Sequence, residues 1–221
     1  MTSLNLLTQH TFLNGHQRRY AHFSSCLNQE AIFSLYLPPR ALQGYAVPAL
    51  YCLPSEHDSD EQFAAQLGAQ RFAASWGIAL IMVSPQLYAA PQFDDYLTQE
   101  LPQLMSSLLV ENHCGIMGRG IGASHALRLA SAYPQHYAAV SAVSPIIDNT
   151  TLLTPVFPSC RVFIDYAAGD DAQAITSWVN HARAAGLNIQ CNHRRHYDNS
   201  FYLLASFIDS HIEFHADALD L

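Results

Sequence analysis

The order of apolar segments predicts an α/β protein with a mostly parallel sheet that is covered by helices on both faces. Short apolar runs of strand length alternate along the chain with longer segments whose apolar residues recur at helical spacing. Some of the short runs, such as residues 78–84, are continuously apolar, which is typical of parallel strands buried on both faces. Strands that alternate with helices join by crossovers into a parallel sheet.

The first expected elements are two strands and a helix. Residues 32–37 alternate and stop at two prolines, and residues 47–53 form a second apolar run. Residues 61–76 place apolar side chains at helical spacing, and Gly77 closes this helix. The other strands are expected at residues 78–84, 114–118, 138–144, 161–166 and 187–192, and the other helices at 94–109, 121–132, 171–185 and 200–219.

Functional residues of a parallel sheet gather at the carboxyl ends of its strands. Three regions of this chain meet that condition. They are residues 54–60, residues 118–124, and residues 169–171 together with 196–200. These loops are therefore the candidate site.

Length and composition exclude several classes of function. The 221 residues suit a single domain over 1–221. Only 13% are charged; all ten basic residues are arginine, and 18 acids give a net charge of −8. Without lysine, a Schiff base, a Walker-type phosphate loop and a Ser–Lys nucleophile are impossible. An acidic chain without a basic run disfavours nucleic acid and anionic membranes as partners.

The chain has the features of a cytoplasmic protein. Its longest apolar runs are too short to span a bilayer, and residues 1–25 are polar without the apolar core of a signal sequence. The five cysteines are odd in number, scattered, and form no Cys-x-x-Cys motif. That pattern is typical of reduced thiols in the cytoplasm.

A glycine-rich turn follows the strand expected at 114–118, and two kinds of site use such a turn. Gly118, Gly120 and Ala123 match the loose form of a dinucleotide-binding fingerprint. That motif should open the fold, whereas here at least three strands precede it. The next strand ends at residues 143–145, Val-Ser-Pro, without the acid that would hold a ribose. The dinucleotide interpretation is therefore disfavoured.

The second kind of site is the nucleophile elbow, Gly-x-Ser-x-Gly, in which a strained turn lifts a serine above the sheet. Residues 118–122 read Gly-Arg-Gly-Ile-Gly, so the spacing of the turn is kept. Its central position is Gly120, which has no nucleophile.

Further motifs occur in segments spread over the whole chain, including Phe-Ser-Leu-Tyr-Leu-Pro-Pro, Glu-Leu-Pro and Tyr-Asp-Asn-Ser-Phe-Tyr. The segments are residues 15–25, 33–39, 63–83, 96–104, 137–146 and 197–211. Together they resemble the S-formylglutathione hydrolase (esterase D) family. The resemblance implies an α/β-hydrolase fold, hydrolysis of thioesters or carboxylic esters by a serine, and no cofactor.

The resemblance also shows where the sequence departs from the family. The family's Gly-His-Ser-Met-Gly-Gly is Gly-Arg-Gly-Ile-Gly-Ala here, which puts Gly120 at the serine position. The family's Tyr-Asp-His-Ser has become Tyr-Asp-Asn-Ser, which puts Asn199 at the histidine position. The acid survives in Gly169-Asp170-Asp171, and we assign it to Asp171. Glycine has no oxygen to attack an acyl carbon, and an asparagine amide does not take up a proton near neutral pH.

The oxyanion region departs as well, since Pro-Ser-Glu-His-Asp of residues 54–58 replaces the family's Ser-Gly-Leu-Thr-Cys. Carboxylates there would repel a developing oxyanion. The acids of this region are expected to decorate the start of a helix, where negative charge is favourable. They are Glu56, Asp58, Asp60 and Glu61. The stretches 84–96 and 147–161 are also shorter than in the family, which should flatten or open the site.

Three other residues could supply the missing chemistry. Ser124 lies in Gly-Ala-Ser-His-Ala and could be a nucleophile one turn later, although it is expected to lie inside the helix. His196 could be a displaced base, although a histidine of a surface loop is expected. Cys114 precedes the turn within the strand and should be buried and inert.

Two histidine pairs have spacings that suit a metal. They are His193 with His196, and His211 with His215. No cysteine or acid completes either set in the sequence, and we expect no metal.

The sequence therefore predicts a degenerate relative of S-formylglutathione hydrolase without serine-hydrolase activity. It would act by binding, assembly or regulation, as a homodimer or paired with an active relative. One alternative is an active esterase or thioesterase that uses Ser124. Another is a binder of a small acyl or glutathione-like ligand, in a remnant pocket above Gly120, Asp171 and Asn199.

Overall fold

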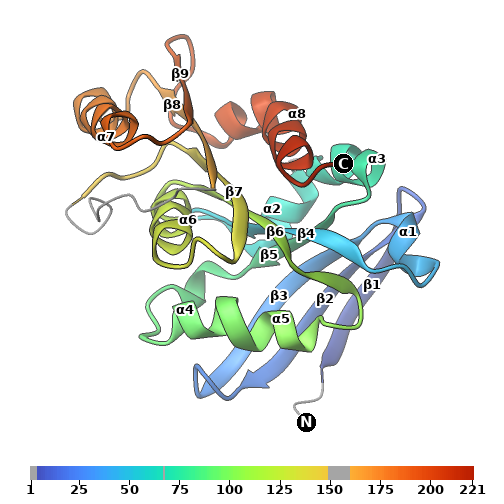
Figure 1. Cartoon of the computed structure of the whole chain (residues 1–221). Coiled ribbons are helices and arrows are strands. Elements are labelled where there is room, and N and C mark those ends of the chain that lie inside the picture. The colour runs from blue at the N-terminus through green and yellow to red at the C-terminus, as the bar shows by residue number, and fades with distance from the viewer. Residues whose placement is uncertain (1–3, 67, 149–159) are drawn as a thin grey trace.

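The computed structural model describes residues 4–66, 68–148 and 160–221, and its centre is a nine-stranded sheet with helices on both faces (Figure 1). The strands are β1 (Asn5–Phe12), β2 (Gly15–Ser24), β3 (Gln29–Leu37), β4 (Val47–Leu53), β5 (Ala79–Val83), β6 (Leu109–Arg119), β7 (Tyr137–Val143), β8 (Arg161–Ala167) and β9 (Ile189–Arg194). The helices are α1 (Pro39–Leu42), α2 (Asp60–Gln66), α3 (Ala69–Trp76), α4 (Phe93–Asp95), α5 (Leu101–Leu104), α6 (Ile121–Ala132), α7 (Ala172–Ala184) and α8 (Phe201–Ala218), with a 3-10 turn η1 (Pro85–Leu87) and a π-helical turn η2 (Tyr96–Glu100).

The strand order is β1-β2-β3-β5-β4-β6-β7-β8-β9. The neighbouring pairs β1–β2, β2–β3 and β3–β5 are antiparallel. From β5 to β9 every neighbouring pair is parallel. The carboxyl ends of β4, β6, β7, β8 and β9 consequently meet at one edge, as the sequence predicted for the candidate loops.

The core consists of two apolar layers, one on each face of the sheet. In β4, Tyr51 and Leu53 belong to the layer under η2, α5, α6 and α7, whereas Leu50 and Cys52 belong to the layer under α2, α3 and α8. All seven residues of β4 and all five of β5 are buried. This burial on both faces explains why these strands are continuously apolar.

Three elements differ from the sequence-based expectation. The helix expected over 61–76 is two helices, because Gly68 between them has a left-handed φ of 65°. The helix expected over 94–109 ends at Leu104, because β6 already begins at Leu109, where it pairs with Val47. The strand β1 has no buried residue, so its sequence lacks the alternation that marks a half-buried strand.

Among the described helices, none is both long and apolar enough to cross a membrane. The structure therefore gives no membrane-spanning helix within the described ranges.

The π-helical turn is fastened to the turn after β2 by one carboxylate. Glu100 accepts hydrogen bonds from the Ser24 hydroxyl (2.6 Å) and from the backbone amides of Ser25 (2.9 Å) and Cys26 (3.0 Å). Burial by itself would raise the pKa of Glu100, but these hydrogen bonds outweigh it and lower the pKa from 4.5 to about 2. The charged form of Glu100 therefore stabilises the folded state.

We expect the Glu100→Gln variant to be less stable than the wild type at pH 7 by about 1–2 kcal/mol, because it loses charge-assisted hydrogen bonds that are partly exposed to water. Since the pKa of Glu100 is lowered in the folded state, the difference should shrink as the pH falls from about 4.5 towards 2. Urea unfolding at several pH values measures this. Glu30→Gln, at an exposed position of β3, is the matched control and should change stability by less than about 0.5 kcal/mol.

Candidate functional site

The turn between β6 and α6 has the backbone conformation of a nucleophile elbow. Gly120 has a φ of 57° and a ψ of −124°, a region that side chains rarely adopt. Its amide donates a hydrogen bond to the carbonyl of Val143 at the end of β7 (2.9 Å), and its carbonyl accepts from the amides of Ala123 and Ser124 in the first turn of α6. The strained turn predicted from the glycine spacing is therefore present.

The two flanking glycines are required by close backbone packing. A Cβ on Gly122 would lie 2.2 Å from the carbonyl oxygen of Leu53 and 2.4 Å from that of Pro54. A Cβ on Gly118 would lie 2.3 Å from the carbonyl of Gly122. The start of α6 thus packs directly on the ends of β4 and β6, and this packing fixes the position of Gly120.

The space directly above Gly120 is bordered by the loop after β4. A Cβ at Gly120 would lie 3.0 Å from the Ser55 hydroxyl oxygen. This loop is held by Asp58, which forms an ion pair with Arg119 (2.8 Å) and accepts a hydrogen bond from the amide of Ser55 (3.3 Å). Both charged side chains are largely buried, so the Arg119 guanidinium compensates the Asp58 carboxylate beside the elbow.

The sequence led us to expect that the acids of residues 56–61 only stabilise the start of a helix. Two of them have further contacts. Asp60 and Glu61 do form the first turn of α2. Asp60, however, is buried, and accepts hydrogen bonds from Arg19 (2.9 Å) and from the Ser34 hydroxyl (2.7 Å). Together with the Asp58 ion pair, this links α2 and its preceding loop to β2, β3 and the elbow.

At the ends of β8 and β9, Asp170 and Asn199 form a hydrogen-bonded pair. The Asn199 amide donates to Asp170 Oδ1 (2.7 Å). The other carboxylate oxygen accepts from the Ser144 hydroxyl (2.6 Å) and from the backbone amide of Ala167 (2.6 Å). Asp170 is thereby oriented as an acid that would position a histidine imidazole, but the group it positions is an amide that cannot take up a proton.

The structure places Asp171 elsewhere, which corrects our choice between the two adjacent acids. Asp171 is the N-cap of α7, where its carboxylate accepts a hydrogen bond from the amide of Ala174 (2.9 Å). Asp170, not Asp171, contacts Asn199. A signal in the sequence favoured this outcome, because an aspartate directly before a helix is a preferred N-cap and leaves its neighbour available for the site.

Ser124, the alternative nucleophile, lies in α6 as expected, and its hydroxyl is fully engaged. It donates to the carbonyl of Ile146 (2.7 Å), accepts from the amide of the same residue (2.9 Å), and lies 3.3 Å from the carbonyl oxygen of Gly120. These contacts tie α6 to the loop after β7, which is a structural role for the hydroxyl.

The histidines of the two spaced pairs lie in different surroundings. His193 and His196 are exposed, on β9 and in the turn that follows it. His211 and His215 are buried between α8 and the sheet, where His215 Nε2 lies 3.0 Å from the Ser141 hydroxyl. Burial lowers the pKa of His215 to about 3, so this ring is neutral. No group of three or more metal-ligating side chains comes together within the ranges that the structure describes.

Cys114 is only half-buried, contrary to our expectation, and it borders a pocket at the other end of β6. Its thiol lies 2.9 Å from the carbonyl oxygen of His136. Burial raises the pKa of the thiol to about 12, so Cys114 is protonated and a weak nucleophile at neutral pH.

Comparison with known proteins identifies the family. Residues 24–201 match the family model described as "Putative esterase". The chain belongs to this esterase family. It is 30% identical to an S-formylglutathione hydrolase of Arabidopsis thaliana over 271 aligned positions, which include 94% of this chain and 95% of the relative. This agrees with the resemblance to S-formylglutathione hydrolases found in the sequence.

Solved structures of two S-formylglutathione hydrolases have the same fold. An S-formylglutathione hydrolase from Agrobacterium tumefaciens superposes with a TM-score of 0.83 at 20% identity, over 97% of this chain and 99% of that one. One from Staphylococcus aureus gives a TM-score of 0.77 at 12% identity, over 90% and 98% of the two chains. The α/β-hydrolase fold predicted from the sequence is therefore confirmed.

This family member is shorter than its plant relative. The alignment runs over 271 positions whereas the chain has 221 residues, so the relative has segments that this chain lacks. Of the two stretches predicted to be short, residues 84–96 contain η1, all of α4 and the first residue of η2. Most of the stretch 147–161 lies outside the described residues.

We expect Gly122→Ala to destabilise the fold by about 2–4 kcal/mol, because its Cβ would overlap the backbone of Leu53 and Pro54, which cannot move aside. Gly120→Ala is the matched control. The Cβ of this variant would contact only the Ser55 side chain. The positive φ of residue 120 should cost about 1–2 kcal/mol. Urea unfolding of both variants compares the two costs, and equal losses would contradict the packing described above.

Proposed function

We propose that this member of the esterase family does not hydrolyse esters by a serine mechanism and acts instead by binding or assembly. The observation that carries the proposal is the elbow itself. Its backbone holds the strained conformation that presents a nucleophile, and the residue in that conformation is Gly120, which has no side chain.

The second support is the pair formed by Asp170 and Asn199. In a serine triad the acid orients a histidine, which takes the proton of the nucleophile. Here Asp170 holds an amide at 2.7 Å, so the orienting half of the arrangement persists while the proton acceptor is missing. Loss of a nucleophile alone removes most of the catalytic effect of a triad, and the loss of both groups acts in the same direction.

Under this proposal the fold serves as a scaffold for a partner. The partner would be a second copy of this chain, an active relative or a small acyl or glutathione-like molecule. The packing of the elbow supports such a role, because the close approach of Gly118 and Gly122 to neighbouring backbone holds the end of the sheet whether or not a nucleophile is present.

We expect purified wild-type protein to show no labelling by a fluorophosphonate. We also expect turnover of p-nitrophenyl acetate and S-formylglutathione far below the range of about 1–10³ s⁻¹ that is common for enzymes. Intact-mass spectrometry and absorbance assays measure the two. Turnover within that range, by protein free of contaminating esterase, would contradict the proposal.

The double variant Gly120→Ser/Asn199→His should gain fluorophosphonate labelling at residue 120. It places a hydroxyl on the elbow and an imidazole against Asp170. Since residue 120 keeps a positive φ and approaches Ser55, we expect the melting temperature to fall by about 2–6 °C.

Two further variants in that background test which acid orients the base. Asp170→Asn should reduce the labelling rate by about 10-fold or more, because it removes the carboxylate that contacts residue 199. Asp171→Asn keeps a residue that can cap α7 and should leave the rate nearly unchanged. The reverse order would contradict the placement of Asp170 at the site.

The alternative is an active esterase that uses Ser124. The position of Ser124 supports this alternative, because Ser124 lies in α6 one turn from Gly120. Its hydroxyl is held by the backbone of Ile146, however, which argues against a free nucleophile. If wild-type protein is labelled and Ser124→Ala abolishes the label without unfolding the chain, the alternative replaces our proposal.

A further inference from the structure

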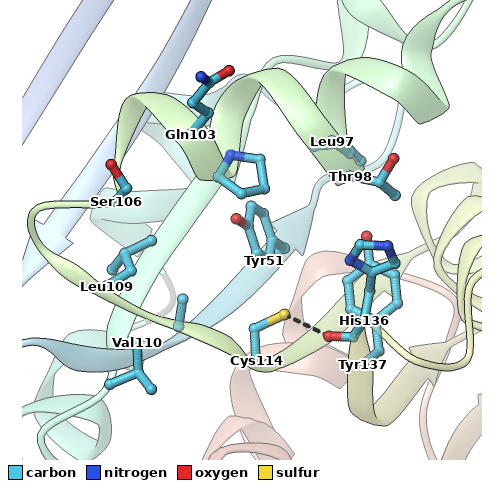
Figure 2. Close-up of a pocket in the computed structure, with 12 residues that line it drawn as sticks. Tyr51, Leu97, Thr98, Gln103, Ser106, Leu109, Val110, Cys114, His136 and Tyr137 are labelled. Carbon is cyan, nitrogen blue, oxygen red and sulfur yellow. Dashed lines mark hydrogen bonds between the residues drawn. The ribbon is translucent and has the colours of Figure 1, made fainter.

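A pocket opens at the amino ends of the parallel strands, at the edge of the sheet opposite Gly120. It has a volume of about 350 Å³ and lies between the helical segment η2–α5 and the starts of β6 and β7 (Figure 2). Ligands of α/β proteins usually bind at the carboxyl edge, where the esterase site lies. This pocket is at the opposite edge and is therefore a separate site. Its lining residues are Ala49, Tyr51, Leu97, Thr98, Pro102, Gln103, Ser106, Leu109, Val110, Cys114, His136 and Tyr137.

The pocket lies beside an irregular part of the sheet. Val47 pairs with Leu109 and Ala49 pairs with Cys114, so four residues of β6 lie opposite Pro48 alone. Proline has no amide hydrogen and cannot complete the ladder here. The start of β6 therefore leaves the regular spacing of the sheet next to the pocket.

The lining is mostly apolar, with three aromatic rings and no acidic or arginine side chain among the described residues. None of the twelve described residues that border the pocket carries a carboxylate or a guanidinium. Tyr51 and Tyr137 meet edge to face, with ring centroids 6.5 Å apart, and Figure 2 shows Tyr51 between the helix that carries Gln103 and the strand that carries Cys114. A charged ligand would lose its hydration here without gaining a compensating charge.

Among the residues that border the pocket, Tyr137 has a hydroxyl that matters for binding. It is buried and has no hydrogen-bond partner among the described residues. Burial raises the pKa of Tyr137 well above 10, so the phenol stays protonated. Its hydroxyl hydrogen therefore needs a hydrogen-bond acceptor. Buried polar groups are nearly always hydrogen-bonded in native proteins, which makes an unpartnered phenol beside a pocket a site for an acceptor on a ligand.

We propose that this pocket binds an uncharged aromatic molecule of one or two rings whose carbonyl oxygen accepts a hydrogen bond from Tyr137. Its volume is about twice the ~150 Å³ of a cavity that holds benzene. The rings of Tyr51, Tyr137 and His136 offer edge and face contacts to such a ligand. This site does not depend on the proposed function of the esterase site.

The probe for this site is coumarin, an uncharged two-ring molecule with a carbonyl oxygen, and the matched charged probe is coumarin-3-carboxylate. Titration calorimetry on the full chain should give a Kd for coumarin of about 0.1–1 mM, as expected for a ligand of this size. The carboxylate should bind at least about 10-fold more weakly, because no arginine borders the pocket to pair with it. Equal binding of the two probes, or no coumarin binding below about 5 mM, would overturn the proposal.

Tryptophan substitutions at two neighbouring positions test where coumarin binds. Ser106 and Ser107 are both exposed, but only Ser106 borders the pocket. Ser106→Trp should fill the mouth of the pocket and weaken coumarin binding at least about 10-fold, whereas Ser107→Trp should leave the Kd unchanged. If Ser106→Trp does not fold, Gln103→Trp, at another exposed lining position, takes its place. Binding that survives a folded, filled variant would place coumarin elsewhere and contradict the proposal.

The donor is tested by Tyr137→Phe, which keeps the ring and removes the hydroxyl. We expect coumarin to bind about 3–10-fold more weakly, the usual effect of one hydrogen bond. The melting temperature without coumarin should not fall, because the hydroxyl has no partner to lose within the described chain. An unchanged Kd would remove Tyr137 from the site.

Discussion

The contact between the first turn of α6 and the carboxyl end of β4 is the constraint on which this end of the molecule depends. Gly122 approaches the backbone of Leu53 so closely that any side chain would overlap it. That approach forces the intervening turn into the conformation seen at Gly120, because the chain must reverse within one residue between β6 and α6. The elbow is therefore a consequence of how helix and sheet pack, and its central residue, Gly120, carries no side chain.

Around this turn, carboxylates are matched with arginines. Asp58 pairs with Arg119 beside the elbow, and Asp60 with Arg19 beneath the start of α2. Asp165, buried in β8, pairs with Arg194 of β9. A guanidinium can satisfy both oxygens of a carboxylate, which a lysine ammonium cannot do in the same planar way. A chain that has few charges and no lysine thus uses several of its arginines to hold loops and strands together at the carboxyl edge of the sheet.

The two edges of the sheet differ in chemistry. At the carboxyl edge, Asp170 is saturated by the Ser144 hydroxyl, the Ala167 amide and the Asn199 amide. At the amino edge, the pocket is aromatic and leaves the Tyr137 hydroxyl without a partner in the described chain. Satisfied polar groups rigidify a structure, whereas an unsatisfied one beside a cavity favours a ligand. The pocket for which we propose a ligand therefore lies at the edge of the sheet opposite the elbow.

The sequence by itself determined the fold and the position of the elbow turn. Continuously apolar strands such as β5 and the glycine spacing of the elbow could be predicted, because each depends on local patterns. The assignment of Gly120 and Asn199 to the serine and histidine positions stays a prediction. Only the tertiary structure decided that Asp170 rather than Asp171 contacts Asn199, and that Cys114 borders a pocket. The N-cap preference marks Asp171 but does not show which acid reaches Asn199, and a pocket arises from how distant segments pack. Both are therefore fixed by contacts between elements, which the order of residues along the chain does not contain.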